Sequence, residues 1–122
     1  MCIRDSFCGL HAFNAFLGYR FFQLIFKSFQ LKNGASIAFL GVLCFLLHPY
    51  QSEVLVWRAC LNYLLITTFI LLYLSHFWHY LQTKKNTHLF YLQGFFIAAL
   101  FTFELALILP FLTIVYLSLI HI

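Results

Sequence analysis

Apolar residues run along the chain in five stretches that polar residues interrupt: residues 7–29, 35–47, 54–80, 89–102 and 105–116. A helix rises about 1.5 Å per residue, so the first and third stretches are long enough to cross a hydrocarbon core about 30 Å thick. The other three are shorter, which favours tilted helices or hairpins. The pattern predicts an all-α, multi-pass transmembrane helical bundle of four to five passes, some of them short or paired as hairpins.

The interruptions carry turn and capping signals. Lys32-Asn33-Gly34 is typical of a turn, and His48-Pro49 ends the second stretch. Ser52 is expected to cap the long helix that follows. A polar elbow at residues 82–88 separates the third stretch from the fourth.

Composition indicates a membrane protein. Hydrophobic residues make up 64% of the chain and charged residues 8%, against roughly 25% charged in an average soluble protein. Mean hydropathy is +0.95, and a water-soluble core of this length does not need so much apolar surface. We expect an integral protein of a bacterial inner (plasma) membrane.

The charges suggest an orientation and a partner. Lys27 and Lys32 flank one interruption, and Lys84 and Lys85 lie in another, so the positive-inside rule places both turns in the cytoplasm. The opposite face then carries His48 and the two glutamates of the chain, Glu53 and Glu104. The basic pI near 9.0 comes from sparse cations that bracket apolar stretches, which favours anionic lipid headgroups over nucleic acid as the partner.

Histidines and cysteines give no metal signature. His76 and His79 have an HxxH spacing, but no carboxylate or cysteine nearby completes a site, so anchoring at the membrane interface is favoured over metal binding. The four cysteines lack CxxC spacing and sit in apolar stretches or at the N-terminus. They indicate neither a disulfide framework nor a metal centre.

Polar residues form a stripe in the first apolar stretch. His11, Asn14 and Gly18 follow a spacing of i, i+3 and i+7, which places them on one side of a helix. Polar groups facing lipid are costly, so this stripe should face protein or a cavity. Helix packing and ligand contact are both open as its role.

A second set of polar residues is expected near the non-cytoplasmic face. His48-Pro49 forms a rigid elbow shortly before Glu53, and Arg58 aligns with Asn62 on the following helix. Asn62 itself, like His11 and Asn14, is expected to contact another helix or a cavity. Arg58 is suited to bind a phosphate or to extend its charge to the lipid headgroups. Glu104 lies between two apolar stretches, where an ionisable residue is either functional or part of a solvated loop.

The two ends of the chain have an unusual coding relationship. Residues 1–6, MCIRDS, are encoded by ATG TGT ATA AGA GAC AG, and its reverse complement, CTG TCT CTT ATA CAC AT, encodes LSLIHI at residues 117–122. The same DNA is the transposon end used in preparing sequencing libraries. We therefore expect both hexapeptides to be adapter-derived rather than natural, and residues 7–116 to be an internal fragment of a longer protein.

Three motifs occur in order within residues 7–116: His11-Ala-Phe-Asn14-Ala, His48-Pro-Tyr-Gln-Ser-Glu53-Val-Leu-Val-Trp57, and Glu104-Leu-Ala-Leu-Ile-Leu-Pro110. Their order and spacing resemble the membrane region of the GT-C glycosyltransferases, in the protein O-mannosyltransferase-like branch. There, HxxNA, HPxxxExxxW and KExxxxxP follow one another. Two positions depart from that pattern: Leu61 replaces an Arg, and Phe103 replaces the Lys before Glu104.

The resemblance implies an enzyme that moves a sugar from a polyprenyl-phosphate donor to an acceptor outside the cytoplasm, with sugar and acceptor undefined. It implies supporting roles for His48, Glu53, Arg58 and Glu104 in orienting the donor phosphate or a divalent metal. The base in such enzymes is an Asp of the first external loop. The only Asp of the chain is Asp5 in the expected adapter, so the resemblance implies a fragment that is inactive by itself.

Two other classes fit a polar set inside a membrane. A transporter or channel also places ionisable residues there, but more often breaks its helices at mid-membrane with Gly or Pro. Pro49 and Pro110 lie near the ends of apolar stretches instead. A non-catalytic membrane scaffold would need no His-Pro-Glu arrangement. An upstream sequence encoding an external loop with paired acidic residues would favour the enzyme.

Overall fold

The computed structural model describes residues 2–49, 57 and 60–121, and within these ranges every regular element is a helix. The elements are α1 (Cys2–Ser28), α2 (Gly34–Leu47), α4 (Leu61–Thr83), α5 (Asn86–Thr102), the short 3-10 helix η2 (Glu104–Leu107) and α6 (Ile108–His121). The predicted all-α class is confirmed. Residues 2–6 are part of α1, and residues 117–121 are part of α6.

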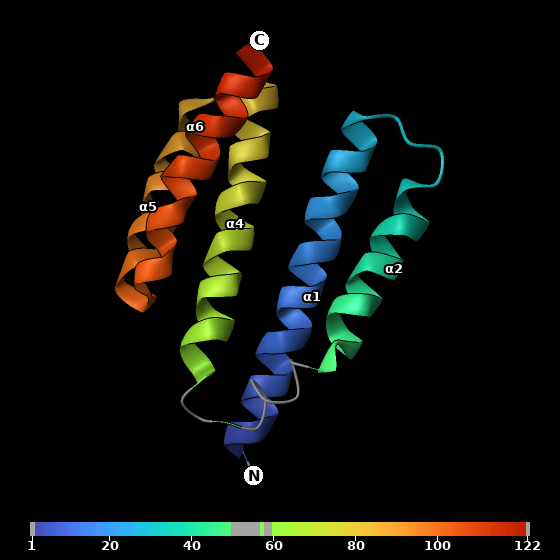
Figure 1. The fold of residues 1–122 in the computed structure, drawn as a ribbon, viewed down its shortest axis with the longest axis vertical. Coiled ribbons are helices and arrows are strands. Elements are labelled where there is room, and N and C mark those ends of the chain that lie inside the picture. Colours follow the sequence, from blue (N-terminus) through green and yellow to red (C-terminus); the bar gives the residue numbers. More distant parts are fainter. Residues whose placement is uncertain (1, 50–56, 58–59, 122) are drawn as a thin grey trace.

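Two helical units lie side by side (Figure 1). The first is the antiparallel hairpin of α1 and α2. The second contains α4, its antiparallel neighbour α5, and the η2–α6 segment that returns along them. The helices α1 and α4 run in the same direction and pack against each other. Since α4 also packs against α5, it lies at the centre of the molecule.

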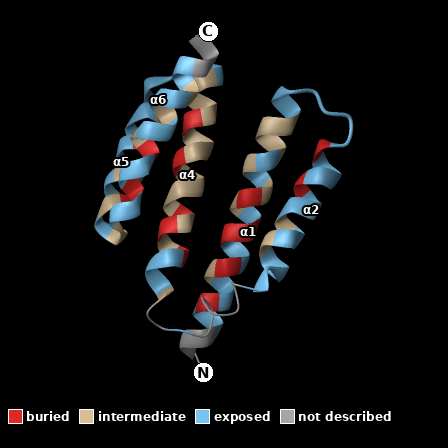
Figure 2. Cartoon of the chain, viewed as in Figure 1, coloured by how far each residue is buried: buried red, intermediate tan, exposed pale blue. Residues whose placement is uncertain are grey.

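The main apolar core lies within the second unit. Its buried members come from α4, α5, η2 and α6: Ile66, Tyr73, Phe77, Leu92, Ala99, Ala106 and Leu109. Figure 2 shows buried positions along the facing sides of α1 and α4, whereas much of α2, α5 and α6 is exposed. Large apolar side chains remain uncovered there, for example Phe101 at 89% and Phe111 at 72% of their surface.

Among the described helices, α4 alone is both long enough and apolar enough to cross a membrane. The helix α1 is longer, but His11, Asn14 and Arg20 interrupt its apolar run. The helix α2 and the segment Glu104–Ser118 are apolar and shorter.

The predicted end of α2 holds, whereas the elbow and the course of the third helix differ from the prediction. His48 ends α2 with an extended backbone, the conformation that steric contact with a following proline favours. The polar elbow contains only Lys84 and Lys85, because α4 continues to Thr83. The long third helix is not continuous from residue 54, because Trp57 is non-helical and the Cys60 amide donates to its carbonyl at 3.0 Å in a turn; α4 begins at Leu61, and the expected cap Ser52 lies outside the described residues.

The turn after α1 depends on a left-handed residue. Gln30 has a φ of 52°, and the amides of Gln30 and Leu31 donate to the carbonyls of Lys27 and Phe26 at 3.2 and 3.1 Å. These two bonds form a Schellman motif, whose left-handed position glycine usually occupies. Lys84 ends α4 in the same left-handed conformation, with a φ of 55°. Each turn therefore retains a side chain where a Cβ is disfavoured.

A glycine sets the distance between α1 and α2 at this turn. Gly34 is buried at the start of α2, and a Cβ built on it would lie only 2.7 Å from the Phe26 Cβ. Real Cβ atoms do not approach so closely, so any other residue at position 34 would push the two helices apart.

The left-handed turn gives a stability prediction. Replacing Gln30 with glycine should stabilise the fold by about 1 kcal/mol, since glycine adopts this conformation without the Cβ penalty. The measurement is unfolding in micelles followed by far-UV circular dichroism. The matched control is Ser28→Gly in the last turn of α1, which should destabilise by about 0.5–1 kcal/mol. Equal destabilisation by both variants would contradict the prediction.

Candidate functional site

A buried polar contact joins α1 to α4. The Asn14 side-chain amide donates to the Leu64 carbonyl at 2.9 Å. The Thr68 hydroxyl lies 2.6 Å from the Asn14 side-chain oxygen and 2.9 Å from the same Leu64 carbonyl. Only 1% of Asn14 is exposed and 8% of Thr68, so water does not compete for these bonds. We call Asn14, Thr68 and the Leu64 carbonyl the Asn14–Thr68 clamp.

His11 is buried one turn before Asn14 but faces the other neighbour. Its ring lies 5.0 Å from that of Phe45 in α2, and only 5% of its surface is exposed. Neither ring nitrogen of His11 has a hydrogen-bond partner. In this position the imidazole fills space between α1 and α2 as an aromatic ring.

Gly18 completes the polar stripe and faces α2 without a steric need for glycine. A Cβ at Gly18 would lie 4.0 Å from a methyl group of Val42. Beside the stripe, a pocket of about 270 Å³ opens between α1, α2 and α4, with Asn14, Gly18 and Gly41 in its lining. The rest of the lining is almost wholly apolar, so this space has no set of polar groups that would recognise a sugar.

The remaining predicted site residues lie at one end of the bundle where they are described. His48 follows α2, Asn62 lies in the first turn of α4 and Glu104 begins η2; all three are exposed. Phe103, beside Glu104, packs against Tyr63 with ring centroids 5.3 Å apart, which brings Glu104 towards the start of α4. Glu53 and Arg58 lie outside the described residues.

The basic turns lie at the other end. Lys27 and Lys32 flank the α1–α2 turn, and Lys84 and Lys85 form the α4–α5 turn; Figure 1 shows both turns at the end away from the N-terminus. The structure therefore separates a lysine-bearing end from an end that carries His48, Asn62 and Glu104. We call the latter the polar end.

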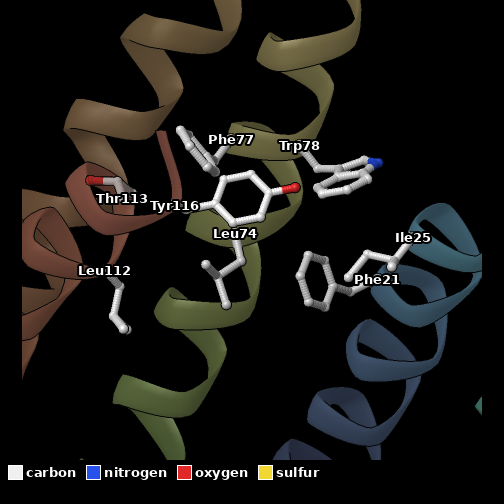
Figure 3. Close-up of a pocket in the computed structure, with 8 residues that line it drawn as sticks. All are labelled: Phe21, Ile25, Leu74, Phe77, Trp78, Leu112, Thr113 and Tyr116. Atoms are coloured by element: carbon white, nitrogen blue, oxygen red, sulfur yellow. The ribbon is translucent and has the colours of Figure 1, made fainter. Parts of the chain in front are cut away.

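An apolar crevice of about 260 Å³ opens between α1, α4 and α6 (Figure 3). Tyr116 of α6 projects into the space between α4 and α1, with its ring 5.9 Å from Phe77 and 6.0 Å from Trp78. Phe21 lines the side formed by α1. The lining is almost entirely carbon, so the crevice suits a hydrocarbon chain and provides no catalytic group.

Three histidines meet near the lysine-bearing end. His76 and His88 place their Nδ1 atoms 3.2 Å apart across α4 and α5, and the His79 ring stacks on that of His88 with centroids 5.5 Å apart. In the described ranges, no three His, Cys, Asp or Glu side chains are arranged to hold a metal ion. The HxxH spacing thus belongs to an aromatic and imidazole cluster.

Thr68 and His88 were absent from the sequence-based candidates. Thr68 is 54 residues from Asn14 along the chain, and nothing local marks it among the hydroxyls of α4. The sequence did not mark His88 either, because it lies three residues after the centre of the 82–88 elbow whereas His76 lies nine residues before it.

Comparison of the chain with models of known families, with characterised proteins and with solved structures finds no match.

The clamp gives a second prediction. Removing Asn14 as Asn14→Leu should cost about 1–3 kcal/mol, because it leaves the Thr68 hydroxyl without a partner on α1. Thr68→Val should remove part of the same interaction, so the double variant should be less destabilised than the sum of the two. Thermal or denaturant unfolding in micelles measures each value.

The control for the clamp is Thr67→Val. The Thr67 hydroxyl donates only to the Tyr63 carbonyl of its own helix, at 2.7 Å. Its removal should change stability by no more than about 0.5 kcal/mol. Strict additivity of the Asn14 and Thr68 variants, or an equal effect at Thr67, would show that the clamp does not join the helices.

Proposed function

We propose that this chain is a membrane-embedded part of a GT-C-type glycosyltransferase, which moves a sugar from a polyprenyl-phosphate donor to an acceptor on the non-cytoplasmic side. Two features support the proposal separately: the character of the helix surfaces, and the placement of the motif residues. The chain itself supplies supporting residues, and the catalytic base comes from an Asp outside residues 7–116.

The helix surfaces support a multi-pass arrangement in a bilayer. Large apolar side chains are exposed on the outer faces of three helices: Phe39 and Leu40 on α2, Phe90, Ile97 and Phe101 on α5, and Phe111 and Ile114 on α6. Apolar patches of this extent mark a membrane or a partner surface. Lipid covering these faces accounts for them without any further protein, and the short helices then insert as hairpins with the longer ones.

The observation that carries the functional proposal is the common position of His48, Asn62 and Glu104 at the polar end. His48 belongs to the second motif and Glu104 to the third, and Asn62 lies in α4, the helix after the second motif. The motifs are distant in sequence, and their shared end is what an active face requires. The lysine turns at the opposite end give the positive-inside orientation, which directs this face away from the cytoplasm.

The proposed roles follow from the chemistry of each group. A His48 imidazole can donate a hydrogen bond to a donor phosphate oxygen, and Arg58 can neutralise the phosphate charge. A bare Glu104 carboxylate would repel that phosphate, so its role is to accept a hydrogen bond from an acceptor or sugar hydroxyl. The described residues do not form a divalent-metal site, and none of these roles depends on one.

The orientation has a direct test. In a variant with all four cysteines replaced by serine, a cysteine at His48 should react with an impermeant thiol reagent added outside intact cells. A cysteine at Asn86, in the first turn of α5, should react only after the membrane is permeabilised. Both positions are exposed, so the difference reports the side of the membrane. Reversed labelling would contradict the placement of the polar end.

The catalytic proposal is tested in a complete protein that contains this segment. Glu104→Gln keeps the shape of the side chain and removes its charge, so turnover should fall about 10- to 100-fold, as for other losses of a supporting group. His48→Ala should also lower turnover while the protein still inserts. The matched control is Gln93→Asn, an exposed residue near the middle of α5, which should leave turnover unchanged.

The assay is transfer of labelled sugar from a polyprenyl-phosphate donor to the acceptor. Unchanged turnover in both the Glu104 and His48 variants would remove these residues from the active face. The 122-residue chain alone should transfer no sugar, because it lacks the catalytic loop. Transfer by the isolated chain would refute the placement of the catalytic base outside residues 7–116.

A further inference from the structure

The imidazoles of His76 and His88 form a direct hydrogen bond between α4 and α5. Their Nδ1 atoms are 3.2 Å apart and their ring centroids 5.5 Å apart. The separation of the ring centroids exceeds the separation of the Nδ1 atoms by about the width of one imidazole ring. Both Nδ1 atoms therefore lie close to the line that joins the two ring centres. That geometry is suited to a linear N–H···N bond.

Surrounding rings fix the position of His76. Tyr91 and Phe95 of α5 stack on it, with ring centroids 5.2 and 5.4 Å away. His88 is held in the same way by His79, whose ring is inclined by only 18° to it. The hydrogen bond is therefore made between side chains that packing has already placed, and little rotamer freedom is lost in forming it.

The number of protons on the pair decides whether the bond exists. With both rings neutral, one Nδ1 carries hydrogen and donates to the lone pair of the other. With one proton added, the bond persists and becomes charge-assisted. With both rings protonated, each Nδ1 carries hydrogen, no acceptor remains, and two positive charges face each other at 3.2 Å.

The described groups around the pair are neutral or positively charged. His79 adds a third imidazole on α4, the connecting turn contributes Lys84 and Lys85, and Tyr91 is the titratable group of α5 beside the pair. On the adjoining elements, α1 carries Lys27 in its last turn and α6 contributes the neutral Tyr116. The carboxylates in the described ranges, Asp5 and Glu104, belong to the opposite end of the bundle.

We propose that the His76–His88 pair is a pH-sensitive latch, which holds the lysine-bearing ends of α4 and α5 together until a second proton breaks it. The closed hairpin binds fewer protons than the open one, because only the open form leaves both imidazoles free to charge. Closing is therefore favoured as pH rises and lost as pH falls. The latch acts at the α4–α5 turn and leaves the distant Asn14–Thr68 clamp intact.

The test is hydrogen–deuterium exchange of the full chain in nanodiscs at about pH 8 and about pH 5, on either side of the ordinary titration of imidazole. The reporters are the Lys84 and His88 amides, which donate to the Tyr80 and Lys85 carbonyls. After correction for intrinsic exchange, their protection should fall about twofold to tenfold at the lower pH, the value of one net hydrogen bond.

Two variants and one control decide the outcome. His76→Asn and His88→Asn each remove a titrating partner, so each should show reduced protection at the higher pH and no further loss at the lower pH. His48→Asn, at the opposite end of the bundle, should keep the wild-type response. Amides in α1 monitor whether each variant remains folded, since they should not change.

A wild-type chain whose turn amides show equal protection at both pH values would overturn the proposal. So would a pH response that survives in both the His76 and the His88 variants, because the titrating group would then be elsewhere. A variant that fails to fold is replaced by His88→Gln, which keeps a hydrogen-bonding side chain of similar length and cannot take up a proton in this range.

Discussion

The hydrogen bonds between Asn14 and the Thr68–Leu64 turn are the interaction on which the arrangement of the molecule depends. The helix α2 packs mainly on α1, and α5, η2 and α6 belong to the unit of α4, so the α1–α4 interface joins the two halves. In the bilayer setting that we propose, apolar contact between helices is hardly better than contact with acyl chains. The buried Asn14 amide reaches its hydrogen-bond partners on α4 at only one axial position of α1. It therefore specifies how the two helical units pack against each other.

The clamp also determines the geometry of the polar end. Asn14 fixes α1 against the first half of α4, and the His11–Phe45 contact fixes the last turns of α2 against α1. His48 follows directly on α2, and Asn62 lies close to Leu64 on α4. The polar stripe of α1 thus holds the helices that carry the proposed active face. Its residues act in helix packing and do not contact a substrate.

The sequence allowed the helical class, α2, α5 and the lysine turns to be predicted, because proline, glycine and paired lysines mark boundaries locally. The start of α4 was not predicted, since no breaker separates the apolar residues before Cys60 from those after it. Asn14 was expected to face protein or a cavity, yet its partner Thr68 could not be named, because the two residues are 54 positions apart and meet only when the helices pack. The positions of Glu53 and Arg58 lie outside the described residues.

The close contact between Gly34 and Phe26 restricts how this protein can vary. The two positions share a volume that holds one aromatic side chain and no second Cβ. The atom in the way is the Cβ of Phe26, so a lineage that gains a side chain at position 34 must also gain glycine at position 26, or the register of the α1–α2 hairpin shifts. Related sequences should therefore show these two sites changing together, eight positions apart, which provides a way to recognise the hairpin in genomes where the surrounding sequence has diverged.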